Sequence, residues 1–197
     1  MIFQIFKAFI VGVCASAPLG PVAVLVMQKT LNNGRGAGFV TGIGCAFIDT
    51  VYALIGVFAL SAINDFFTRN EAIFYLVGGA LVVIVGVLML FRRTLGTVKE
   101  VSHFTKAGYA VQAAGMALAN PGAIALMLAL LALFRVEAPS WVTVPSVTLG
   151  ALFWWNVFAF FVDKFRSTLK LGTVITINKI LGVLVIIFGI VCILKIF

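Results

Sequence analysis

Long apolar runs with few or no charged side chains dominate this sequence and leave few folds open to it. Each run has about the 20 residues that a helix needs to cross a lipid bilayer. Two of the runs contain charge, a lone Asp49 in the second and lysines near both ends of the last. The six runs are Ala8–Gln28, Gly36–Asn64, Ala72–Phe91, Ala107–Phe134, Ala138–Val162 and Ile177–Ile196. The sequence therefore predicts an all-α integral membrane protein of six transmembrane helices, forming a single transmembrane domain over residues 1–197.

Composition and charge agree with this class. Hydrophobic residues make up 63% of the chain and charged residues only 10%, whereas soluble domains are about 45–50% apolar and about 25% charged. The net charge of +8 would suggest a nucleic-acid partner in a soluble protein, but here it follows the positive-inside rule. Most Lys and Arg residues fall in or beside the 1–2, 3–4 and 5–6 connections, Lys29, Lys164 and Lys179 among them. We therefore expect both termini to face away from the cytoplasm, and no nucleic acid to bind.

Two proline-containing breaks occur in corresponding segments. The first run carries "SAPLGPVAV" (Ser16–Val24), and the fourth carries "NPGAIALM" (Asn120–Met127). Pro removes a backbone donor and disrupts a helix interior at a cost of about 3 kcal/mol. Pro21 and Pro121 lie 100 positions apart, each in the first helix of a three-helix half. Because three is odd, the halves must enter the membrane in opposite directions, which predicts an inverted 3+3 repeat over roughly 1–91 and 107–197.

Paired breaks of this kind are the best sequence pointer to a transporter's binding site. A broken helix leaves backbone groups that lipid cannot satisfy, so protein, water or a ligand must meet them. The N-terminal ends of half-helices also favour anionic groups such as a carboxylate. The alternative is a pair of kinked helices satisfied by neighbouring side chains. The breaks predict that the following residues bind the substrate: Ser16, Pro18, Gly20, Pro21, Asn120 and Pro121.

Asp49 is the one acidic residue well inside a predicted span. A centrally placed Asp costs about 2.5 to 3.5 kcal/mol on insertion scales, so it suggests function by default. Spacings of three and four place it on one helical face of small and polar residues: Gly42, Cys45, Asp49, Tyr52 and Gly56. The carboxyl group can carry a proton or receive an ammonium group, or it can be a structural partner of the broken first helix. Asn156 occupies the equivalent middle of the fifth span and completes the nominated site.

Other chemistry has little support in the sequence. Walker loops, H-E-x-x-H motifs and nucleophile elbows are absent, so we expect no enzyme activity. His103 has no second ligand at metal-site spacing, so neither a metal nor a cofactor is expected. Cys14, Cys45 and Cys192 lack C-x-x-C spacing and are interpreted as small buried hydrophobes. The sequence leaves the oligomeric state open, and a homodimer is among the states that it allows.

Several motifs together resemble the LysE-type translocator family. They are "PLGP" in the first segment, "GRGAGFVTGIGCAFIDTVYAL" (Gly34–Leu54) in the second and "NPGA" (Asn120–Ala123) in the fourth. The family often has Lys after Asn-Pro, where this chain has Gly122. The resemblance implies export of amino acids or related small metabolites across the bacterial inner membrane, by exchange with protons. It gives an amino-acid-like solute, a proton or other coupling ion and the lipid bilayer as partners.

A second interpretation is a transmembrane thiol–disulfide carrier of the same superfamily design. Such proteins carry redox cysteines beside prolines on the first and fourth helices. Cys14 lies on the first segment, but Ala107–Phe134 contains no cysteine. Without a partner thiol there is no disulfide to exchange, so transport is the favoured prediction.

Overall fold

The computed structural model describes residues 1–17, 20–62, 71–91, 105–137, 139–167 and 171–194, and these are folded as helices joined by turns. Pro18 and His103, singled out above, lie outside the described residues. The all-α class is confirmed for the described chain, which holds no strand. The helices are α1 (Ile2–Ser16), α2 (Pro21–Asn33), α3 (Arg35–Ala62), α5 (Glu71–Phe91), α6 (Lys106–Leu118), α7 (Pro121–Leu133), α8 (Ser140–Lys164) and α9 (Leu171–Leu194).

Two of these helices, α3 and α8, are each long and apolar enough to cross a membrane alone. The pair α6 and α7 meets the same criterion as one span bent by 74°. Shorter apolar stretches are Ile2–Ser16, Tyr75–Leu88 and Gly182–Leu194. By length and composition, the described helices therefore provide two or three candidate spans, and the chain is a multi-pass membrane protein in architecture.

Both prolines predicted to break a helix begin a new one. Gly20 precedes α2 with an extended backbone (φ −102°, ψ −161°), and Pro21 is the first helical residue. Asn120 precedes α7 in the same way, and Pro121 is its first residue. Proline is favoured at this position because its missing N–H has no helical partner there and its φ is already helical. The same local structure, an extended residue followed by a proline that begins a helix, therefore occurs at both breaks.

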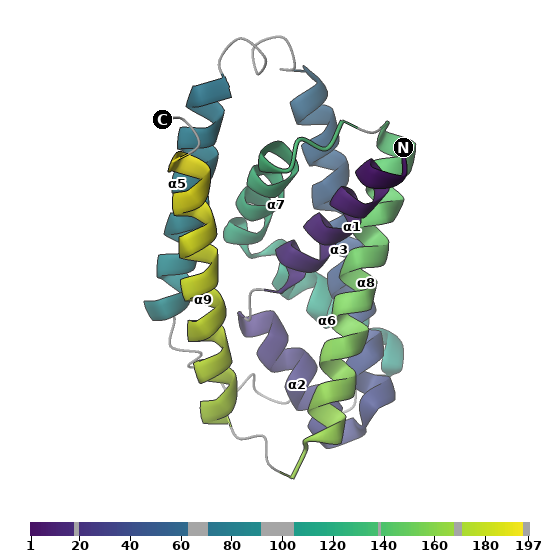
Figure 1. Cartoon of the computed structure of the whole chain (residues 1–197). Helices are drawn as coiled ribbons and strands as arrows, with labels where there is room; N and C mark the ends of the chain where they lie inside the picture. The colour runs from purple at the N-terminus through teal and green to yellow at the C-terminus, as the bar shows by residue number, and fades with distance from the viewer. Residues whose placement is uncertain (18–19, 63–70, 92–104, 138, 168–170, 195–197) are drawn as a thin grey trace.

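The half-helices pack in pairs around the long helices. Figure 1 shows α1 and α7 in the upper half of the molecule and α2 and α6 in the lower half, and α1 contacts α7 as α2 contacts α6. The long helix α3 packs on α8 and α6, while α8 also packs on α1. On the opposite side of the molecule, α5 and α9 form an extensive antiparallel pair that reaches the rest through α7. The beginning of α1 and the end of α9 lie at the same end of the molecule (Figure 1).

Glycines permit the closest of these helix crossings. A Cβ atom on Gly44 of α3 would lie on the carbonyl oxygen of Ala110 in α6. A Cβ atom on Gly150 of α8 would likewise lie on the carbonyl oxygen of Phe9 in α1. Small residues at such crossings are how membrane helices gain van der Waals contact without a hydrophobic driving force.

Several basic residues that the sequence places in connections lie inside helices, and that part of the interpretation was wrong. Lys29 is in α2 and Lys164 ends α8, while Lys179 is in α9, as the last apolar run predicted. Backbone hydrogen bonding extends a helix beyond its apolar stretch, and at the exposed Lys164 and Lys179 the long lysine stem lets the ammonium reach a polar environment from within the helix. Helix α9 accordingly begins at Leu171 rather than near Ile177.

Candidate functional site

Asp49 lies in the middle of α3 and is only 8% exposed. Its four companions on the predicted small and polar face are buried as well, so the spacing argument identified the interior face of this helix correctly. A carboxyl group at this depth is expensive unless hydrogen bonds compensate for the lost water. Its surroundings therefore define the centre of the candidate site.

Two hydrogen bonds reach this carboxyl group, and both end on Oδ2. The Ser16 hydroxyl donates from the last residue of α1 at 2.7 Å. The Trp155 indole N–H donates from the middle of α8 at 3.4 Å, a long and correspondingly weaker bond. Neither donor occupies Oδ1, so a proton can be carried there without displacing either. Asp49 thus joins the end of the first half-helix to the two longest helices.

Tyr52, one turn further along α3, makes the matching contact with the other break. Its hydroxyl donates to the carbonyl oxygens of Ala117 and Leu118, each at 3.2 Å. These carbonyls belong to the last turn of α6, where N–H donors from the same helix run out. The Ala117 carbonyl also accepts the backbone N–H of Asn120 at the second break. Two polar residues of one helix face therefore bind the ends of both broken segments.

Three buried polar atoms near the fourth segment and α8 have no hydrogen-bond partner in the described structure: Gln112 Oε1, Asn120 Oδ1 and Trp154 Nε1. Asn120 precedes α7, yet its side chain does not cap that helix. Buried polar atoms are nearly always satisfied by protein, water or a ligand. Asn120 Oδ1 is therefore an acceptor available to a bound donor such as an ammonium group.

The lower half-helices are joined by a buried cation. Lys29 of α2 is 8% exposed, and its ammonium nitrogen lies 4.6 Å from the centre of the Tyr109 ring in α6. An aromatic face attracts a desolvated cation by about 2 kcal/mol or more. The sequence counted Lys29 only as a basic connection residue, so this contact was missed.

The nominated residues do not all meet at one point. Ser16 and Asp49 are bonded, Gly20 and Pro21 begin the adjoining half-helix, Tyr52 lies beside the second break, and Asn120 and Pro121 form that break. Asn156 instead lines an outer groove with Arg35, away from the carboxyl group. Trp155, its neighbour, is the residue that bonds Asp49. Adjacent helical residues point about 100° apart, so identifying the inward-facing one requires the packing of α8.

The described fold and this buried polar centre define an integral membrane protein built around interrupted helices. A family model for the LysE type translocator matches residues 13–195. The chain belongs to the LysE type translocator family, whose members move small molecules across membranes. Comparisons with curated proteins and with solved structures gave no match.

Proposed function

We propose that this protein exports an amino acid or a related small metabolite across the bacterial inner membrane, in exchange for protons carried by Asp49. One observation carries the proposal: α3 presents Asp49 to the end of α1 and Tyr52 to the end of α6. A change in the charge of Asp49 is therefore felt directly at a helix break. Interrupted helices at the membrane midplane are the usual location of transporter binding sites.

An amino acid fits the polar groups at these breaks. The Asp49 carboxylate and the unpartnered Asn120 Oδ1 are acceptors for its ammonium group. The N-terminal ends of α2 and α7 carry partial positive charge and favour its carboxylate. This combination of acceptors and helix ends supports the proposed substrate class.

A single buried acidic residue in the described chain, Asp49, supports exchange with protons. An unneutralised carboxylate within the membrane is costly, so Asp49 is stabilised either by a proton or by the substrate's ammonium group. Because the two compete for one carboxyl group, the protein returns across the membrane loaded with one or the other. This competition couples export to proton entry without ATP.

An inverted repeat of six membrane crossings gives this exchange its structural basis. Gly44 of α3 meets Ala110 of α6, and Gly150 of α8 meets Phe9 of α1. If α1 corresponds to α6 and α3 to α8, these are the same crossing in both halves. The glycines lie 106 positions apart and their carbonyl partners 101 positions apart. Both offsets are close to the 100 positions that separate Pro21 from Pro121.

The same correspondence pairs Asp49 with Trp155. These two residues are hydrogen-bonded to each other, and a residue that contacts its own counterpart lies on the axis relating the halves. The coupling carboxyl group would then sit at the point about which two inverted repeats rock in alternating access. The proposed orientation has both chain ends outside the cytoplasm, as the distribution of basic residues predicts.

Efflux from whole cells tests the proposed function. Cells producing the protein are preloaded with a panel of radiolabelled amino acids, and loss of each label is followed over time. We expect at least one amino acid to leave several times faster than from cells producing Asp49→Asn at the same level. If every amino acid leaves equally fast from both, the proposed export is wrong.

The thiols provide a separate prediction that distinguishes transport from thiol–disulfide exchange. Cys14 is partly buried, while Cys45 and Cys192 are buried, and none of the three forms a disulfide within the described chain. Because the proposed mechanism uses no thiol, replacing all three with Ala should leave efflux within about twofold of wild type. The assay is the same radiolabel efflux, with membrane content checked by immunoblot. Loss of activity at normal content would favour the redox function instead.

A further inference from the structure

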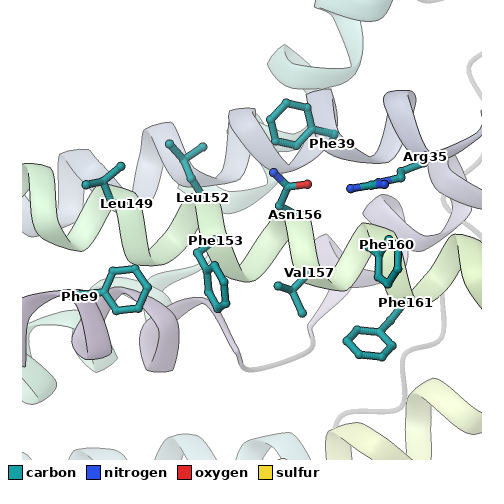
Figure 2. A pocket seen from close by; sticks show the side chains of 10 residues that line it. All are labelled: Phe9, Arg35, Phe39, Leu149, Leu152, Phe153, Asn156, Val157, Phe160 and Phe161. Carbon is teal, nitrogen blue, oxygen red and sulfur yellow. The ribbon is translucent and has the colours of Figure 1, made fainter. Parts of the chain in front are cut away.

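An open apolar groove runs along the outer face of α8. Its volume is about 910 Å³. Figure 2 shows the side chains of α8 along its length, with Phe9 of α1 on one side and Phe39 and Arg35 of α3 on the other. The α8 residues recur at spacings of three and four, which makes them one stripe of the helix: Leu149, Leu152, Phe153, Asn156, Val157, Phe160 and Phe161. Asp49 and its two donors do not line this groove.

The groove has the length of one lipid leaflet. From Leu149 to Phe161 the helix rises about 18 Å, and half of a bilayer's hydrocarbon core is about 15 Å. Leu149 and Phe153 are 61% and 53% exposed. In a membrane protein these side chains face acyl chains, so a lipid tail fits the groove along its full length.

Basic groups gather at one end of the groove. The Arg35 guanidinium lies 4.9 Å from the centre of the Phe160 ring, and the Lys164 ammonium lies 5.9 Å from the same ring. Within the described chain, neither cation forms an ion pair, and no acidic side chain lines the groove. These two cations lie around one aromatic ring, at the start of α3 and the end of α8. The described residues supply no counter-charge to them, and an anionic headgroup would do so.

Asn156 places an amide partway along this otherwise apolar wall. Figure 2 shows it between Leu152 and Arg35, with its oxygen turned toward the Arg35 end. The residues that the structure describes offer this amide no hydrogen-bond partner. A lipid-facing amide without a partner is costly. Asn156 lies further along the groove than the two cations at its basic end, which is where the glycerol ester of a phospholipid would lie if its phosphate met those cations.

We propose that this groove binds an anionic phospholipid. Arg35 and Lys164 hold its phosphate, Asn156 hydrogen-bonds its glycerol ester, and one acyl chain lies along the exposed stripe of α8. A second copy of the chain fits less well. In a twofold dimer the same surface is used by both copies, which would bring these cations toward one another with no acid between them. The proposal is independent of the transport function.

Binding is tested on the purified full chain by native mass spectrometry with dioleoylphosphatidylglycerol and, as the neutral probe, dioleoylphosphatidylcholine. We expect wild type to retain the anionic lipid preferentially. Arg35→Gln combined with Lys164→Gln should weaken its binding roughly tenfold, because each basic group near an anionic membrane contributes several-fold. The matched control combines Lys7→Gln with Lys179→Gln, which removes the same charge outside the groove and should leave binding unchanged.

A second variant and a cross-linking test separate lipid binding from contact between two copies of the chain. Asn156→Leu removes a lipid-facing polar group, so the fold should be retained while anionic-lipid binding falls about threefold. Equal binding by wild type and the Arg35/Lys164 variant would overturn the proposal. Equal losses in that variant and in the Lys7/Lys179 control would also overturn it. So would efficient cross-linking between Leu149→Cys copies lacking the three native cysteines, because the groove would then hold a second chain.

Discussion

Replacing Asp49 with Asn should lower proton-driven export by two orders of magnitude or more while leaving the fold intact. The amide oxygen of Asn can still accept hydrogen bonds from Ser16 and Trp155, which wild-type Asp49 receives on Oδ2. The substitution removes the charge that is costly in the membrane, so thermal stability should stay equal or rise. The measurement is radiolabel efflux at matched membrane content, together with the melting temperature of the purified protein.

Asp163→Asn is the matched control for this result. Asp163 lies one residue before the end of α8 and is only partly buried, so the same chemical change there should leave efflux near wild type. Asp49→Glu keeps a titratable carboxyl group and should retain some export with a shifted pH dependence. Wild-type efflux from Asp49→Asn would mean that the carboxyl group is structural.

The largest expected effect on stability comes from a single methyl group at Gly150. In Gly150→Ala the new Cβ would lie on the Phe9 carbonyl oxygen and 3.0 Å from the backbone nitrogen of Val13. Both obstacles are backbone atoms of α1, so relief requires α1 and α8 to separate. Overpacking of this kind costs typically about 1 to 3 kcal/mol, and a backbone obstacle puts this case at or above about 3 kcal/mol. The melting temperature should therefore fall, so that much less of the protein stays folded after heating.

Gly115→Ala provides the comparison for this variant. A Cβ at Gly115 in α6 would meet no atom within 4 Å, and Ala is the better helix former by about 1 kcal/mol. Fluorescence-detected size exclusion after heating should therefore show Gly115→Ala at or above wild type and Gly150→Ala far below it. Equal stability of the two variants would refute the close crossing of α1 and α8.

Helix type and helix breaks were predictable because their causes are local. An uncharged run of membrane length predicts a helix, and Pro21 and Pro121 end one helix and begin another through their own covalent geometry. The interior face of α3 was predictable for the same reason, because helical spacing alone gathers Asp49 and Tyr52 on one side. Helix ends were less accurate, since α2 continues past Lys29 to Asn33 and α9 begins at Leu171, before the apolar run does.

The partners of the site residues were not predictable, because they depend on packing between segments far apart in the chain. Trp155 and Asn156 are adjacent and both lie in an apolar span, yet one bonds Asp49 and the other lines the outer groove. The contact of α3 with α8 determines which of the two side chains faces Asp49 and which faces the groove. The contact of Lys29 with Tyr109 likewise joins helices 80 positions apart, and no spacing rule connects them.

The most direct test of proton exchange at Asp49 uses proteoliposomes containing either wild type or Asp49→Asn. An inward or outward pH gradient is imposed, and movement of the amino acid identified in cells is recorded together with the internal pH. The account predicts that wild type moves solute against its gradient with protons flowing the opposite way, while Asp49→Asn, which lacks the carboxylate shared by the proton and the ammonium group, moves neither uphill. Uphill transport by Asp49→Asn at the wild-type rate, with the same pH dependence, would contradict the mechanism.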